Sequence, residues 1–99
     1  MGASDFYQFG KGNTIKDAFL AAREEAAYDC GHSGYTGTLA EKNDFVLIKT
    51  PKVQTDKEAT ELAHKLIEAN DKRIDDKWGP AGAIPVKKDR WLFFGWASS

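Results

Sequence analysis

Cysteine is almost absent from the sequence, and so are the marks of exported and membrane proteins. The one cysteine, Cys30, cannot form an intramolecular disulfide. Only two histidines accompany it, so a structural zinc site would need carboxylate ligands, which is uncommon. No apolar run approaches the roughly 18 residues of a membrane span. Residues 1–9 lack the basic start and apolar stretch of a signal peptide. We therefore expect a cytoplasmic protein with no metal and no membrane segment.

An excess of one charge sign is also missing. The chain has 14 lysines and arginines against 15 aspartates and glutamates, for a formal net charge of −1. Non-specific nucleic-acid binding needs a net basic face, and a DNA mimic needs a large acidic excess. Neither class fits this balance. The length of 99 residues, with 41% hydrophobic and 29% charged residues, indicates one ordinary globular domain.

Helical and strand-like patterns divide the chain into seven elements. Ile15, Ala18, Phe19 and Ala22 recur at the spacing of one helix face. Thr55-Asp-Lys-Glu58 is a capping box that opens a second helix. The expected elements are a strand over 5–9, a helix over 15–28, a hairpin of 35–41 and 44–50, a helix over 56–72, and a hairpin of 81–87 and 90–97.

The order β-α-β-β-α-β-β predicts an α+β fold. Its first six elements match a ferredoxin-like arrangement, with one extra strand at the C-terminal end. Right-handed crossovers would then place both helices on one face of a mainly antiparallel sheet. The two hairpins also resemble each other at a constant offset, which indicates either an internal duplication or merely shared turn residues. The matched pairs are Gly34 with Gly79, Gly37 with Gly82, Leu39 with Ile84, Lys42 with Lys87, and Asp44 with Asp89.

The last expected strand is apolar on both of its faces. Two helices cover about one face of a five-stranded sheet, so a second apolar face would be left uncovered. Such a patch usually marks an interface. The alternative is that the sheet buries both sides and this face is core. The residues expected to form the interface are Phe45, Leu47, Leu92, Phe94 and Trp96.

The most reactive-looking segment follows the first helix. Cys30 and His32 lie close together there, but a helix C-terminus disfavours a thiolate, so we expect no catalytic residue and no cofactor. A glycine-rich ligand loop is the alternative use of this segment, with Gly31, His32, Gly34, Tyr35 and Gly37 as its residues. The segment 10–14 precedes a helix, and its amides could hold an anion. His64 is expected at the surface, on the polar face of the second helix.

Two segments resemble small uncharacterised bacteriophage proteins. They are Gly31-His-Ser-Gly-Tyr-Thr-Gly-Thr-Leu-Ala-Glu-Lys42 and Phe93-Phe-Gly-Trp-Ala-Ser98. Those proteins share a glycine-histidine loop before a hairpin and an aromatic ending. The resemblance carries over no activity and no catalytic residue. It implies a phage protein that acts inside a bacterial cell, often by binding a host component.

Together these patterns predict a non-catalytic protein-binding module. Its partner would be a host or defence protein, or a second copy of the chain. The alternative is a small-ligand or nucleotide-binding protein that uses the glycine-rich loops. Nucleic acid and membrane are not expected as partners, since neither a basic face nor an apolar span is present.

Overall fold

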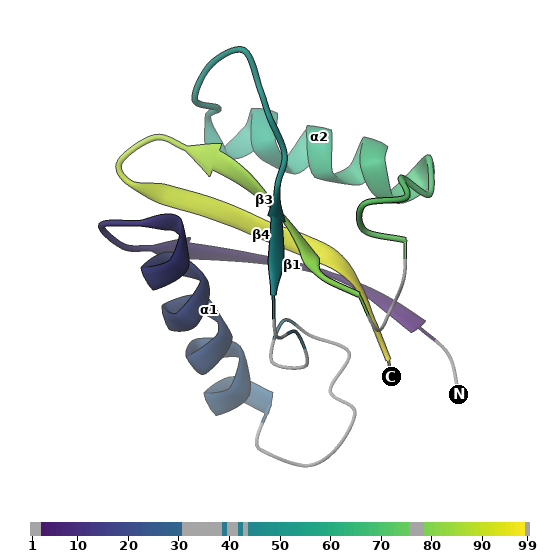
Figure 1. Cartoon of the computed structure of the whole chain (residues 1–99), viewed down its shortest axis with the longest axis horizontal. Coiled ribbons are helices and arrows are strands. Elements are labelled where there is room, and N and C mark those ends of the chain that lie inside the picture. The colour runs from purple at the N-terminus through teal and green to yellow at the C-terminus, as the bar shows by residue number, and fades with distance from the viewer. Residues whose placement is uncertain (1–2, 31–38, 40–41, 43, 76–78, 99) are drawn as a thin grey trace.

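The computed structural model describes residues 3–30, 39, 42, 44–75 and 79–98. Two helices and four strands lie within them (Figure 1). Neither helix has the length and apolar character needed to cross a membrane. In chain order the elements are β1 (Ala3–Lys11), α1 (Ile15–Cys30), β2 (Phe45–Leu47), α2 (Asp56–Glu68), β3 (Ala81–Val86) and β4 (Arg90–Ser98).

The four strands form one mixed sheet in the order β1-β4-β3-β2. β4 pairs antiparallel with both β1 and β3, whereas β2 pairs parallel with β3. The α+β class is therefore confirmed, but the ferredoxin-like strand order is not.

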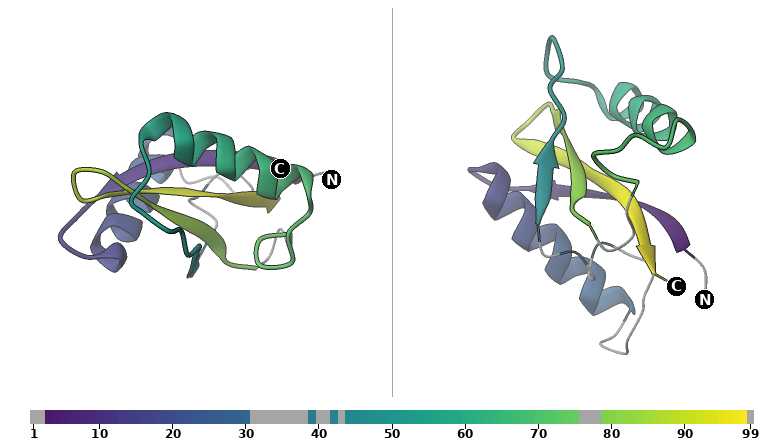
Figure 2. Two further views of the ribbon diagram at one scale, coloured as in Figure 1. Left: turned by 90° about the horizontal axis from the view of Figure 1, so that it is seen from above. Right: turned by 45° about the vertical axis from the view of Figure 1, so that its right-hand side comes forward.

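The helices lie on opposite faces of this sheet, so the prediction of two helices on one face is wrong. Phe93 of β4 packs against Phe19 of α1, with ring centroids 5.5 Å apart. Its neighbours Leu92 and Phe94 belong to a separate core with Ala63 of α2. Successive side chains of a strand point to opposite faces, so these contacts place the helices on either side. Figure 2 shows the sheet between them.

The strand order explains this arrangement. The connection through α1 runs from the β1 edge to the β2 edge of the sheet, and the connection through α2 runs back from β2 to β3. Crossovers between parallel strands are right-handed almost without exception. Two right-handed crossovers that travel in opposite directions leave their helices on opposite faces. The sheet is consequently a middle layer, and strands buried on both faces read as continuous apolar runs.

The first expected hairpin is not formed as predicted. Most of its first strand, over 35–41, lies outside the described residues. The second strand is shorter than expected, and its described partner is β3. The Ile48 N–H donates to the Ala83 carbonyl at 2.8 Å, in a parallel ladder. Lys42, which lies between the two expected strands, is 2% exposed and donates from Nζ to the Gly79 carbonyl at 2.8 Å. The described residues show no second copy of the β3–β4 hairpin, so the duplication is not supported.

The second hairpin is confirmed. β3 and β4 pair in a continuous antiparallel register from Gly82–Phe94 to Val86–Arg90. Lys88 and Asp89 at its tip both have positive φ angles, of 68° and 56°. Left-handed residues suit a tight hairpin turn because their twist matches that of the flanking strands.

Both ends of α2 follow from local chemistry. The Thr55 N–H donates to Glu58 Oε1 at 3.0 Å, and the Glu58 N–H donates to Thr55 Oγ1 at 3.2 Å, which completes the expected capping box. The helix ends four residues earlier than predicted, because Asn70 adopts a left-handed conformation with φ 52°. The Asp71 N–H then bonds to the Leu66 carbonyl, as in a Schellman motif.

Candidate functional site

The outer edge of β1 is the most distinctive open surface of the fold. Among the described residues, β1 pairs only with β4, and it forms one border of the sheet (Figure 1). The strand spans nine residues without a proline, and its register with β4 is continuous from end to end. Natural edge strands are usually short, bulged, or interrupted by proline or charge. In β1, charged side chains occur only towards the two ends, at Asp5 and Lys11.

Backbone hydrogen bonds define which residues of β1 face this edge. The Gly12 N–H donates to the Asp89 carbonyl at 3.2 Å and continues the β1–β4 register. Alternate residues of an antiparallel strand direct their N–H and C=O groups to the same side. The even-numbered residues, such as Gln8, therefore bond to β4. The odd-numbered residues, such as Tyr7 and Phe9, direct their amides and carbonyls outward.

Contacts on the other side of the sheet also show that the odd-numbered residues of β1 direct their backbone groups outward. The Ile48 N–H bonds to the Ala83 carbonyl, so the odd-numbered residues of β3 face β2. Its even-numbered residues then bond to even-numbered residues of β4, as in the Gly82–Phe94 pair. This leaves the odd-numbered residues of β4, such as Phe93, to bond to β1. Two independent sets of contacts thus leave the same β1 groups pointing outward.

A small polar cluster lies beside this edge on the α2 side. The Tyr7 hydroxyl donates to Asp5 Oδ2 at 2.9 Å and lies 3.1 Å from His64 Nδ1. The two rings are 4.5 Å apart between centroids. A tyrosine has one hydroxyl proton, and a carboxylate can only accept. With the Tyr7 proton directed at Asp5, the contact with His64 is a hydrogen bond in the tautomer whose Nδ1–H donates to the Tyr7 oxygen.

The cluster is not built as a nucleophile. Desolvation, the Asp5 hydrogen bond, and the negative charges of Asp5 and Glu68 together raise the pKa of Tyr7 to about 12. A neutral phenol at physiological pH is a weak nucleophile and a weak base. Within the described part of the chain, no group of three or more metal-ligating side chains could hold an ion.

The opposite end of the edge is basic. Lys11 is exposed at the end of β1, and Arg90 is its register partner in β4. Arg90 forms a two-contact ion pair with Asp56 at the start of α2. Its guanidinium also lies 5.4 Å from the centre of the Phe9 ring. The edge therefore runs from an acidic end at Asp5 to a basic end at Lys11.

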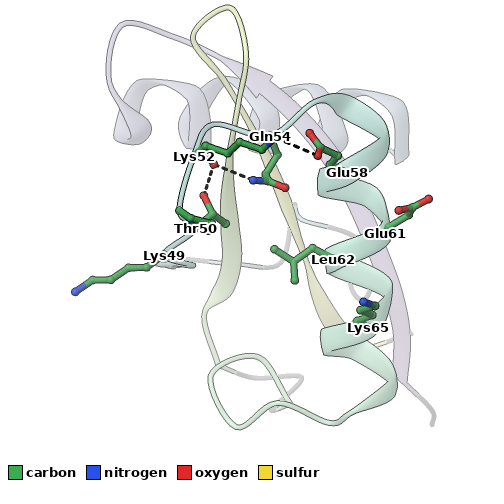
Figure 3. Close-up of a pocket in the computed structure, with 9 residues that line it drawn as sticks. Lys49, Thr50, Lys52, Gln54, Glu58, Glu61, Leu62 and Lys65 are labelled. Carbon is green, nitrogen blue, oxygen red and sulfur yellow. Dashed lines mark hydrogen bonds and ion pairs between the residues drawn. The ribbon is translucent and has the colours of Figure 1, made fainter.

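A second surface feature is a hollow of about 450 Å³ between the β2–α2 connection and α2 (Figure 3). Lys52 in its wall lies 3.7 Å from Glu58, and its carbonyl accepts hydrogen bonds from Thr50 and Gln54. Acidic and basic groups are mixed around it, so its charge favours no one class of ligand. Its lining residues are Lys49, Thr50, Pro51, Lys52, Gln54, Glu58, Glu61, Leu62 and Lys65.

The five residues expected to form an aromatic interface do not share one surface. Leu92 and Phe94 are completely buried in the core beneath α2, and Trp96 packs partly against the same core. Phe45 packs on the other face, 5.0 Å from Phe19 of α1 between ring centroids. Only Leu47, at 46% exposure, is substantially open. The expectation of one uncovered face is wrong because a helix covers each side.

The structure describes only one of the two expected ligand loops. Gly31, His32, Gly34, Tyr35 and Gly37 all lie outside the described residues. Gly10, at the start of the other loop, has a packing role: a Cβ there would lie 2.4 Å from the Ala18 carbonyl oxygen. The Asp17 N–H already bonds to Thr14 Oγ1 at 3.1 Å, and an acidic Asp17 in the first turn opposes an anion.

The β1 edge and its cluster were missed by the sequence reasoning. His64 was correctly expected at the surface, but nothing in the sequence indicates that β1 lies next to α2. The alternation of Asp5, Tyr7, Phe9 and Lys11 is a visible signal, because odd positions of one strand share a face. Reading it as an edge requires the strand order.

Comparisons with known proteins add no family to this picture. No protein-family model matches the sequence, and searches of curated proteins and of solved structures found no match.

Proposed function

We propose that this chain is a non-catalytic protein-binding module that pairs through the outer edge of β1. The observation that carries the proposal is the row of outward N–H and C=O groups along nine residues, with no described partner beyond it. An exposed strand edge offers main-chain hydrogen bonds to an incoming strand, and adjacent side chains supply specificity.

The side chains beside the edge suit this use. Tyr7 and Phe9 are half-buried aromatics in the centre, flanked by the exposed charges of Asp5 and Lys11. Aromatic centres with polar rims are typical of protein interfaces. The partner is either a second copy of the chain or a host or defence protein, and the resemblance to bacteriophage proteins supports a bacterial cell as the setting.

A matched pair of substitutions tests the edge. Asp5→Pro removes an outward N–H and places a ring on the approach path, while the β4 ladder keeps its bonds. Asp5→Ala removes the same carboxylate but keeps the N–H. Each protein is used to capture partners from a bacterial lysate, with melting temperature as the folding control. We expect a protein retained by the wild type and by Asp5→Ala to be lost with Asp5→Pro.

A third variant, Leu47→Pro, alters the opposite edge of the sheet. Leu47 is exposed. The even-numbered residues Asp44 and Ile48 bond to β3, so the N–H of the odd-numbered Leu47 points away from β3. Capture that survives Asp5→Pro but is lost with Leu47→Pro would place binding at β2 and contradict the proposal.

A further inference from the structure

We propose that the strand which adds to β1 is β1 of a second copy of this chain, in an antiparallel pairing centred on Gln8. This inference rests on the proposed function, because it uses the same edge. The pairing of the two β1 strands joins the two four-stranded sheets into one continuous sheet across a two-fold axis. A two-fold contact needs a surface that is complementary to itself, and β1 has one.

The backbone permits this register. Centring the pairing on Gln8 places Tyr7 opposite Phe9 of the second copy, and Asp5 opposite its Lys11. All four positions are odd-numbered, so each one points its N–H and C=O at the approaching strand. Opposed residues of this kind exchange two hydrogen bonds per pair. No outward group in the central part of β1 is left without a partner.

The side chains select the same register. Asp5 and Glu68 make one end of the edge acidic, and the exposed Lys11 is the cation at the other end, where Arg90 is already paired with Asp56. An antiparallel two-fold brings each acidic end against a basic end. It also places Tyr7 beside an aromatic ring, and aromatic and opposite-charge pairs are stabilising cross-strand combinations. A shift by one residue would oppose outward and inward backbone groups instead.

The helices leave room for this contact. Strands are about 4.8 Å apart, so the two β4 strands would be about 14 Å apart across the axis. α2 packs over β3 and β4 and reaches β1 through His64. Packed helices need only about 8–10 Å between axes, so the two copies of α2 fit side by side. α1 lies over β1 and β4 on the other face, which brings its two copies to about 10 Å.

Charge exchange tests the pairing in the full-length chain. Asp5→Lys places a lysine opposite Lys11 of the second copy, and Lys11→Asp places an aspartate opposite Asp5. Either change alone turns two attractive contacts of the dimer into repulsive ones. We expect each single variant to weaken the dimer about tenfold at low salt, measured by sedimentation velocity over a concentration series. The double variant restores the opposite charges and should regain wild-type association.

Each outcome decides the proposal. A wild-type dimer, weakened by both single variants and restored in the double variant, supports it. A wild-type chain that stays monomeric into the millimolar range contradicts the proposal that a second copy pairs with the β1 edge. A dimer that none of the variants affects overturns the register. If Asp5→Pro still abolishes capture of another protein while the wild type is monomeric, the proposed function stands and only this inference fails.

Discussion

Tyr7 is the residue at which the edge strand, α2 and the acidic end of the edge meet. Its folded-state pKa of about 12 lies above the ordinary value of 10.0. The neutral phenol is therefore favoured in the fold, and this contribution to stability is fully present below pH 10. It is lost as pH rises through about 12. We expect the ultraviolet titration difference between wild type and Tyr7→Phe to fall near pH 12, and a difference near pH 10 would contradict the cluster.

Asp71 gives the opposite sign of pH dependence. Its side chain accepts hydrogen bonds from the Arg73 side chain and backbone at 2.9 Å, which lowers the pKa of Asp71 to about 2. This contribution is present above the ordinary value of 3.8 and is lost as pH falls through about 2. NMR titration of the Asp71 carboxyl carbon should show a midpoint near pH 2 in wild type and a higher midpoint in Arg73→Ala.

Phe94 was expected at an interface, but it lies in the core, and a stability measurement tests this assignment. Because the side chain is completely buried beneath α2, Phe94→Ala should cost about 3–5 kcal/mol of folding stability. Leu47→Ala removes a side chain that is 46% exposed and should cost clearly less. Chemical denaturation of both variants measures the difference. Equal losses would mean that the burial of β4 is misassigned.

At the scale of the element, short-range signals located the start of α2 and the second hairpin. The capping box of Thr55 and Glu58 correctly predicts where α2 begins, and Lys88 and Asp89 correctly predict the hairpin turn. The end of α2 was placed four residues too late, because the expected helix over 56–72 ran through Asn70. A left-handed asparagine ends helices almost as well as glycine, so that signal was available.

The capping box also yields a prediction. Thr55→Ala removes the acceptor for the Glu58 N–H and should lower the free energy of unfolding by about 1 kcal/mol. Thr55→Ser keeps the hydroxyl and should stay close to wild type. Thermal unfolding of the two variants provides the measurement, and an equal loss in both would show that the cap hydrogen bond is not the source.

At the scale of the whole molecule, the sequence was insufficient to predict how the strands pair and on which faces the helices lie. The apolar residues on both faces of β4 were recognised, but they were assigned to an open face because two helices were placed on one side. That assignment depended on pairing β2 with a neighbouring strand in a hairpin. The actual partner, β3, is more than 30 residues away in sequence and parallel, and local turn residues carry no information about it. The candidate site could not be predicted for the same reason, since recognising β1 as an edge strand requires the order β1-β4-β3-β2.

Amide hydrogen exchange along β1 tests the central claim most directly, because it reports each N–H separately. In a dilute solution of the chain, we expect slow exchange at Phe6 and Gln8, whose amides bond to β4, and fast exchange at Tyr7 and Phe9, whose amides face outward. Raising the protein concentration should protect Tyr7 and Phe9 selectively as the edge becomes paired. Protection of all four amides at a concentration at which the chain sediments as a monomer would show that the edge is already covered within one copy, and would contradict its role as a binding surface.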